Sequence, residues 1–247
     1  MQLHIYPDAD TTVAAMAGFF IGVANKAIEE KGVCNIVLSG GNTPRKLYEL
    51  LASPAYRDKL NWTKMYFFFG DERDVLPDHP DYNGKMAREA LLGPLYIPAH
   101  HAFYIDTTHG PKQAAKAYDS LIRSYFGNND PQFDLVLLGL GDNAHTASLF
   151  PHTAILENNS SLVSEVYVEE LKTHRISMTA RLINQASAIA FLVYGQSKAE
   201  AVRNVIEGIG SYSESPAQLI NPISGELHWY LDEAAASKLK RKSILRD

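Results

Sequence analysis

The sequence predicts an α/β fold in which a mostly parallel sheet is covered by helices on both faces, formed as a single domain over residues 1–247. Three observations support this prediction. Short runs such as CNIVLS and FDLVLLG are apolar almost throughout, as in strands that are buried on both faces. These runs alternate along the chain with longer segments of helical pattern. No repeat, low-complexity segment or long linker divides the chain.

The expected helices are recognised by their ends. The first follows aspartate and threonine residues and stops at Gly32, which favour a helix start and a helix stop. In the second we expect Thr43 as the N-cap residue and Pro44 at the first helical position. Gly93 and Pro94 end the third. The expected helices lie within residues 8–32, 43–53, 83–93, 110–127 and 197–208.

The expected strands are short and rich in β-branched and aromatic residues. The weakest of them covers residues 102–105. In a parallel sheet, ligands bind at the carboxyl ends of the strands, in the turns that lead to the helices. The expected strands are residues 34–39, 64–70, 102–105, 133–139, 174–179, 187–195 and 226–232.

Composition limits the classes of function. The chain is 46% hydrophobic and 21% charged, which is typical of a globular protein with a core. Its net charge of −5 does not predict nucleic-acid binding, so an anionic ligand must be held by a local cluster. The basic run at residues 238–242 is interpreted as a solvated tail. The single cysteine, Cys34, excludes an intramolecular disulfide framework and is interpreted as a buried, inert thiol.

No apolar run is expected to reach the ~18 residues that span a membrane. The first residues also lack the basic-then-apolar pattern of a signal peptide. We therefore expect a cytoplasmic protein without a membrane partner, whose oligomeric state the sequence leaves open.

The turn LSGGNTP is the first candidate site. Gly40 and Gly41 allow a tight turn and a close approach to a ligand, and the helix beginning near Asn42 and Thr43 offers unpaired N–H groups. These features predict phosphate binding, although a tight, well-capped turn explains the same residues.

Charged side chains follow other expected strands. Asp71 and Arg73 come after residues 64–70, while Arg175 and Lys198 lie at the edges of later elements. Such side chains either gather in a site or face water. At one edge of a parallel sheet, these cations can converge on the glycine turn and bind an anion there.

His145 follows the strand at 133–139 and is expected at the start of a short helix that Pro151 ends. It is badly placed for filling the core, and its ordinary pKa of ~6.5 suits proton transfer near neutral pH. No second histidine lies at metal-ligand spacing, so we favour a general base over a metal ligand and expect no metal. The spacing of Gly139, Gly141 and Ala144 matches a dinucleotide fingerprint, but no long helix follows, so we expect no dinucleotide.

Together, LSGGNTP, GDERDVLPDHPDYN, DLVLLGLGDNAHTASLFP, RISMT and GQSKAEAV resemble the 6-phosphogluconolactonase family, in order across nearly the whole chain. The run HTASLFP is the most specific of these motifs. The resemblance implies a Rossmann-like sheet and hydrolysis of a small sugar phosphate, 6-phosphogluconolactone, to 6-phosphogluconate without a required cofactor.

The resemblance also implies roles for individual residues. His145 would take a proton from the attacking water, and backbone N–H groups of residues 141–145 are expected to stabilise the oxyanion. Which cation touches the phosphate is left open. The expected substrate-binding residues are Gly40, Gly41, Asn42, Thr43, Asp71, Arg73, Arg175 and Lys198.

The chain departs from the family pattern at Ala144, where the family has glycine. If this position requires a positive φ, alanine costs on the order of 1 kcal/mol. Two alternatives therefore stay open. One is an amino-sugar phosphate deaminase with Asp71 or Asp142 as its base, and the other is a sugar-phosphate binding protein without turnover.

Overall fold

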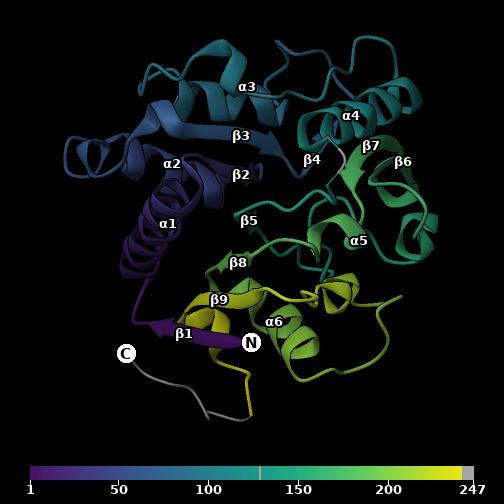
Figure 1. The fold of residues 1–247 in the computed structure, drawn as a ribbon. Helices are drawn as coiled ribbons and strands as arrows, with labels where there is room; N and C mark the ends of the chain where they lie inside the picture. Colours follow the sequence, from purple (N-terminus) through teal and green to yellow (C-terminus); the bar gives the residue numbers. More distant parts are fainter. Residues whose placement is uncertain (128, 241–247) are drawn as a thin grey trace.

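A computed structural model describes residues 1–127 and 129–240. Its main sheet has six strands in the order β1-β9-β8-β5-β2-β3, and all neighbouring pairs are parallel (Figure 1). The predicted α/β fold with a mostly parallel sheet is therefore confirmed. The strands are β1 Gln2–Tyr6, β2 Cys34–Leu38, β3 Met65–Phe69, β5 Leu135–Leu138, β8 Ala188–Val193 and β9 Glu226–Asp232.

A second, antiparallel sheet has the order β4-β7-β6 and was not predicted. Its strands are β4 Asp71–Arg73, β6 Val163–Val168 and β7 Thr173–Met178. Residues 71–73 were expected as a turn, and residues 174–179 as part of the parallel sheet. The residue pattern of a segment indicates that it forms a strand, but it does not indicate which other strand it pairs with.

The helices alternate with the parallel strands, as predicted. Gly32 ends the first one in the left-handed conformation, with φ 81°. The expectation of Thr43 as an N-cap is wrong, because the second helix already begins at Asn42 and Gly41 precedes it. A π-helical turn, Arg88–Leu92, continues α3. The helices are α1 Ala9–Lys31, α2 Asn42–Ala52, α3 Asn83–Ala87, α4 Pro111–Phe126, α5 Ala180–Ile183, α6 Ala199–Ile206 and α7 Glu233–Ala236.

Two further expectations fail. Residues 102–105 form no strand, since only an isolated bridge joins Ala102 to Phe67. His145 does not start a helix, because the chain after β5 runs through turns up to Pro151. Ala144 and Ala147 in this stretch, and His152 just after it, have positive φ angles of 46–59°, which interrupt any helix.

The expectation that no apolar run is long enough to span a membrane is wrong for helix α1. By length and composition it is the one helix in the described part of the chain that could cross a membrane. Its inward side is instead buried in the core, since Met16, Phe20 and Ala24 are fully buried. The helix packs against β9, β2 and β8.

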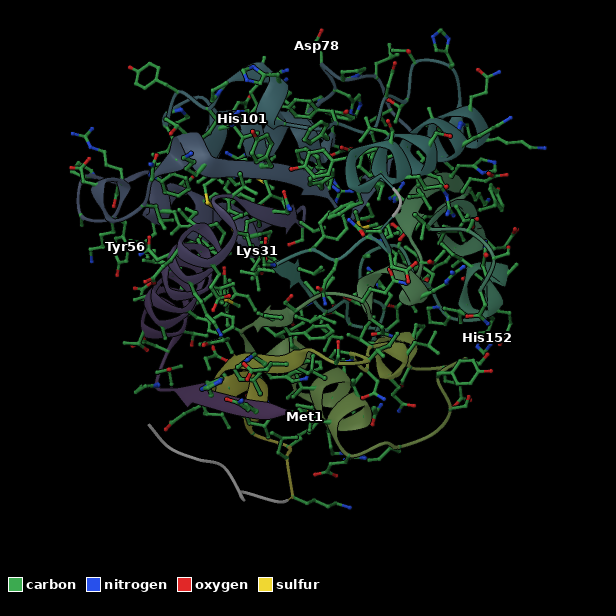
Figure 2. The ribbon with its side chains drawn as sticks, viewed as in Figure 1. Met1, Lys31, Tyr56, Asp78, His101 and His152 are labelled. Carbon is green, nitrogen blue, oxygen red and sulfur yellow. The ribbon has the colours of Figure 1, made fainter. Side chains whose placement is uncertain are left out.

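The hydrophobic core lies along the main sheet. Phe67, Phe191 and Trp229 are fully or almost fully buried in it, and the prediction of a buried Cys34 is confirmed. In Figure 2, His101 lies inside this packing, whereas Asp78 projects at the periphery. The predicted tail at 238–242 lies partly outside the described residues.

Candidate active site

A cavity of about 520 Å³ opens at the carboxyl edge of the main sheet. Its wall consists of the turns that follow β2, β5 and β8, with side chains of β4 and β7. This is the place where open parallel sheets bind their ligands. The cavity brings together every residue predicted for the site: Gly40, Gly41, Asn42, Thr43, Asp71, Arg73, His145, Arg175 and Lys198.

The turn after β2 presents backbone rather than side chains. Gly41 has a φ of 103°, a conformation that strains any L-residue. No side chain caps α2, so its first N–H groups are left for a ligand or water. These groups and the positive end of the 11-residue helix favour the binding of an anion at this turn.

Two arginines stand directly opposite each other on neighbouring strands. Arg73 of β4 and Arg175 of β7 form a cross-strand pair, an arrangement that destabilises a sheet when both charges are alike. Arg73 is held by a hydrogen bond of 2.5 Å from its guanidinium to the carbonyl of Asp81. Burial, and then the neighbouring Arg73, lower the pKa of Arg175. The pair therefore gains from an anion placed between the two guanidinium groups.

Lys198 supplies a third cation from the turn after β8. Its Nζ lies 2.6 Å from Oδ1 of Asp142, which belongs to the turn after β5. Asp142 is largely exposed, so a bound anion can compete with it for the ammonium group.

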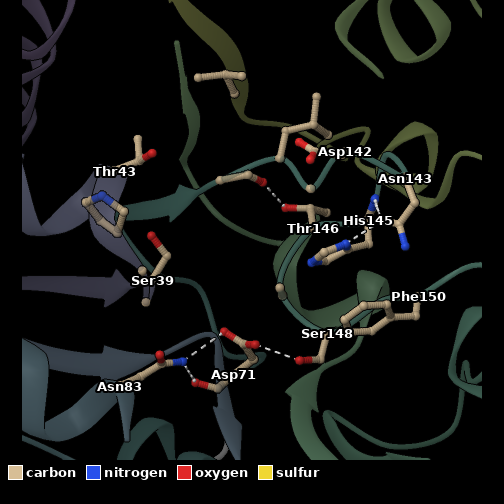
Figure 3. A pocket seen from close by; sticks show the side chains of 18 of the residues that line it. Ser39, Thr43, Asp71, Asn83, Asp142, Asn143, His145, Thr146, Ser148 and Phe150 are labelled. Atoms are coloured by element: carbon tan, nitrogen blue, oxygen red, sulfur yellow. Dashed lines mark hydrogen bonds between the residues drawn. The ribbon is translucent and has the colours of Figure 1, made fainter. Parts of the chain in front are cut away.

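The imidazole of His145 is fixed in one orientation. Its Nδ1 lies 2.5 Å from Oδ1 of Asn143, and the ring stacks on Phe150 with centroids 4.1 Å apart. Because an amide oxygen only accepts hydrogen bonds, Nδ1 carries the proton and Nε2 keeps its lone pair. Figure 3 shows the ring extending into the cavity. His145 is thus arranged as a neutral base.

The backbone around the histidine is as closely constrained. A Cβ on Gly141 would lie 2.1 Å from the His145 ring, so only glycine fits there. The N–H of Gly141 donates to the carbonyl of His145 over 2.8 Å, and that of Ala144 donates to Gly141. Ala144 is buried with a φ of 59°, so this position does require the left-handed conformation.

The electrostatic surroundings keep His145 unprotonated. Burial, and then the positive charges of Lys198 and Arg175, lower its pKa to about 4. The pKa is therefore well below the ordinary value assumed from the sequence. A bound dianion would offset the two cationic contributions and raise it.

A polar cluster around Asp71 lies beside the glycine turn. Ser148 donates to Oδ2 of Asp71 over 2.6 Å, and the Nδ2 of Asn83 donates to the backbone carbonyl of Asp71 over 3.0 Å (Figure 3). Glu72 is buried behind them, and burial raises its pKa to about 8. Asn83, Asn143 and Phe150 were all missed. Asn83 contacts Asp71 of β4 from the start of α3, whereas the contacts of Asn143 and Phe150 with the nearby His145 depend on the conformation of the turn.

No group of three or more histidine, cysteine or acidic side chains in the described ranges is arranged to hold a metal ion. The fold and the cavity together define an α/β protein with a cavity lined by cations and a neutral histidine at the carboxyl edge of its sheet.

Comparisons with known proteins agree with this class. A family model described as glucosamine-6-phosphate isomerases/6-phosphogluconolactonase matches residues 7–229. A 6-phosphogluconolactonase of Synechocystis is 42% identical, covering 87% of this chain and 88% of the relative. That of Haemophilus influenzae is 35% identical, with 83% and 87% covered.

Solved structures give the same picture. The 6-phosphogluconolactonase from Thermotoga maritima superposes with a TM-score of 0.81 at 28% identity, covering 94% of this chain and 99% of the other. The enzyme from Trypanosoma brucei gives a TM-score of 0.85 at 26% identity, with 96% and 98% covered. The chain belongs to the glucosamine-6-phosphate isomerase/6-phosphogluconolactonase family.

Proposed function

We propose that this protein hydrolyses 6-phospho-D-glucono-1,5-lactone to 6-phospho-D-gluconate, with His145 as the general base. The observation that carries the proposal is the neutral imidazole of His145, fixed by Asn143 in the same cavity as an uncapped helix N-terminus and three cations. The lactonases among its relatives, one of them 42% identical, support the same reaction.

The reaction needs a base of this kind. A lactone is an activated ester, so water attacks its carbonyl once Nε2 of His145 removes a proton, which typically contributes ~10²–10⁴-fold. The C1–O5 bond then breaks, and the proton on Nε2 passes to the leaving ring oxygen. No covalent intermediate and no cofactor is required.

Hydrogen bonds within the turn change which N–H groups of residues 141–145 can stabilise the oxyanion. The N–H groups of Gly141 and Ala144 are already used within the turn. Oxyanion stabilisation therefore falls to the other N–H groups at the site and to the cations around it.

The substrate phosphate is assigned to the glycine turn and the neighbouring cations. The first N–H groups of α2, with Asn42 and Thr43, would contact its oxygens, while Lys198 exchanges Asp142 for the phosphate. Arg73 and Arg175 gain a shared counter-ion. Binding energy from this remote group then orients the lactone carbonyl toward His145.

This assignment also distinguishes the lactonase from the alternatives. A deaminase would need a carboxylate base, whereas the group that this cavity fixes in a neutral, proton-accepting form is the imidazole of His145. A binding protein without turnover would not need a histidine with its tautomer fixed. We further propose that residues 1–247 act as one domain in the cytoplasm.

Lactone turnover tests the proposal. The lactone is generated in place from glucose 6-phosphate at mildly acidic pH, where spontaneous hydrolysis is slow, and its loss is followed with the native chain and with His145→Ala. We expect acceleration by the native chain and a loss of at least about 100-fold in kcat in the variant. Exchange of an exposed histidine, His109→Gln, serves as the matched control. Native protein that binds 6-phosphogluconate but does not accelerate hydrolysis contradicts the proposal.

A further inference from the structure

We propose that Glu72 is a positioning residue, which holds the guanidinium of Arg73 where it can bind the substrate phosphate. The inference rests on the proposed function, because it concerns one of the cations to which that phosphate is assigned. Glu72 is 1% exposed and does not line the cavity, so it cannot contact the substrate itself. Any effect of Glu72 on the reaction must therefore pass through the residues that it holds.

Strand β4 directs alternate side chains to opposite sides. Asp71 and Arg73 line the cavity, whereas Glu72 between them is buried on the other side of the strand. The strand has only three residues and lies at the edge of its sheet, in the order β4-β7-β6. Because so short an edge strand has few ladder hydrogen bonds, the position of Arg73 depends on additional contacts, and Glu72 provides them.

The carboxylate of Glu72 accepts three backbone N–H groups. Its Oε1 lies 2.9 Å from the nitrogen of Arg73 and 2.7 Å from that of Asn83, and its Oε2 lies 2.9 Å from the nitrogen of Gly84. Asn83 and Gly84 are the first residues of α3, so their N–H groups have no partner within the helix. A single buried side chain thus joins β4 to the start of α3.

The same contacts orient the guanidinium of Arg73. Residues 74–82 connect β4 to α3, and Glu72 closes this loop because it binds the backbone on both sides of it. Near the far end of the loop, the carbonyl of Asp81 accepts the 2.5 Å hydrogen bond from the guanidinium. Glu72 therefore fixes both the backbone from which the Arg73 side chain extends and the segment that carries its acceptor.

Arg73 needs this support because a second cation lies opposite it. Arg175 is the cross-strand partner of Arg73, and like charges in such a pair repel each other. A guanidinium that is held in place before the ligand arrives also binds more tightly, since no binding energy is lost in ordering it. The buried carboxylate thus keeps the two cations close enough to share one anion.

The test combines ligand affinity with steady-state kinetics in Glu72→Gln. The amide has one acceptor oxygen instead of two, so the N–H group that meets its nitrogen loses its partner. We expect the affinity for 6-phosphogluconate, measured by calorimetry, to fall roughly tenfold and the KM of the lactone to rise by a similar factor. Because His145 lies on another turn, kcat should stay within about threefold of the native value.

Asp119→Asn is the matched control. The carboxylate of Asp119 likewise accepts two backbone N–H groups, those of Leu162 and Val163, over 2.6 and 3.2 Å, but it does not line the cavity. The control therefore removes the same kind of contact at a distance from the proposed site. Affinity and KM should both stay within about twofold of the native values.

A second mutation separates positioning from general damage to the fold. In Arg73→Gln the guanidinium is absent, so adding Glu72→Gln should lower the affinity by no more than about a further twofold. A role of Glu72 that does not act through Arg73 would cost the same factor in both backgrounds. If Glu72→Gln does not fold, Glu72→Asp, which keeps both oxygens on a shorter side chain, replaces it in this cycle.

Three outcomes overturn the proposal: an unchanged affinity in Glu72→Gln, an equal loss with and without Arg73, or an equal loss in Asp119→Asn. All three concern the binding of 6-phosphogluconate, which is measured whether or not the protein hydrolyses the lactone. Native protein that binds 6-phosphogluconate without turnover contradicts the proposed function alone. Native protein that does not bind it overturns both proposals.

Discussion

Two glycine-containing turns lie at the same edge of the main sheet but present different groups to the cavity. The turn after β2 contains Gly40 and Gly41 and leads into an 11-residue helix whose first N–H groups are uncapped. The turn after β5 contains Gly139 and Gly141, but it uses its amides internally and leads into no helix. The first therefore offers backbone donors to a ligand, whereas the second displays one side chain, His145.

The difference has a physical cause. After Gly41 the chain continues in right-handed helical conformation, so the peptide dipoles align and unpaired N–H groups collect at one end. After Gly141 the positive φ angles of Ala144 and Ala147 prevent a helix. The glycines likewise differ, since Gly41 is needed for its φ of 103° and Gly141 for the space that the imidazole occupies.

The largest effect is expected when the histidine turn loses that space. In Gly141→Ala the new Cβ would lie 2.1 Å from the His145 ring, so the imidazole must move. Misplacement of a catalytic group by about 1 Å can cost ~100-fold, and we expect a loss of that order in kcat. Gly139→Ala, where a Cβ meets nothing within 4 Å, should stay within about twofold. Equal losses in the two variants would contradict the account.

The proposed binding of the substrate phosphate is tested at Lys198. Replacement by glutamine removes one charge-assisted bond to the phosphate, and we expect affinity for 6-phosphogluconate to fall at least about tenfold. Calorimetry measures this change, while kcat should fall much less. Lys238→Gln, which breaks an exposed ion pair of 2.7 Å to Glu200, is the control. If kcat falls by as large a factor as the affinity for 6-phosphogluconate, Lys198 takes part in the chemical step and not mainly in binding.

The pH dependence of kcat/KM connects the two turns. Only unprotonated His145 accepts a proton, and its pKa is lowered to about 4, so activity should rise through that pH and then level off. Lys198 contributes to the lowering, so Lys198→Gln should move the inflection to higher pH. Lys238→Gln should leave it in place. A shift toward lower pH in the first variant would have the wrong sign.

The smallest effect concerns the strain in the histidine turn. Ala144 has a φ of 59°, which glycine adopts freely, so Ala144→Gly should raise the free energy of unfolding by about 0.5–1 kcal/mol. Urea denaturation measures the change. The same exchange at Ala14, within α1, should destabilise by a similar amount because helical alanine is preferred. If both exchanges destabilise the protein, the turn is not strained.

Much of this molecule could be predicted from local pattern. Runs that are apolar on both faces, such as residues 133–139, identify buried strands of a parallel sheet. Gly32 identifies the end of α1, because glycine readily adopts the left-handed conformation found there. The topology of such sheets then places the strand ends at one edge. For that reason Gly40, Asp71, His145 and Lys198 were correctly expected to gather in one place.

Contacts between distant segments were decided only by the tertiary structure. The antiparallel pairing of β4 with β7 sets Arg73 opposite Arg175, and the link from Ser148 to Asp71 joins residues 77 positions apart. The pKa of His145 also changes through burial and through cations on other elements. Local sequence determines which backbone conformations and side chains are available. The hydrogen-bond and strand partners of a residue, its desolvation and the electrostatic potential around it depend on how the whole chain packs.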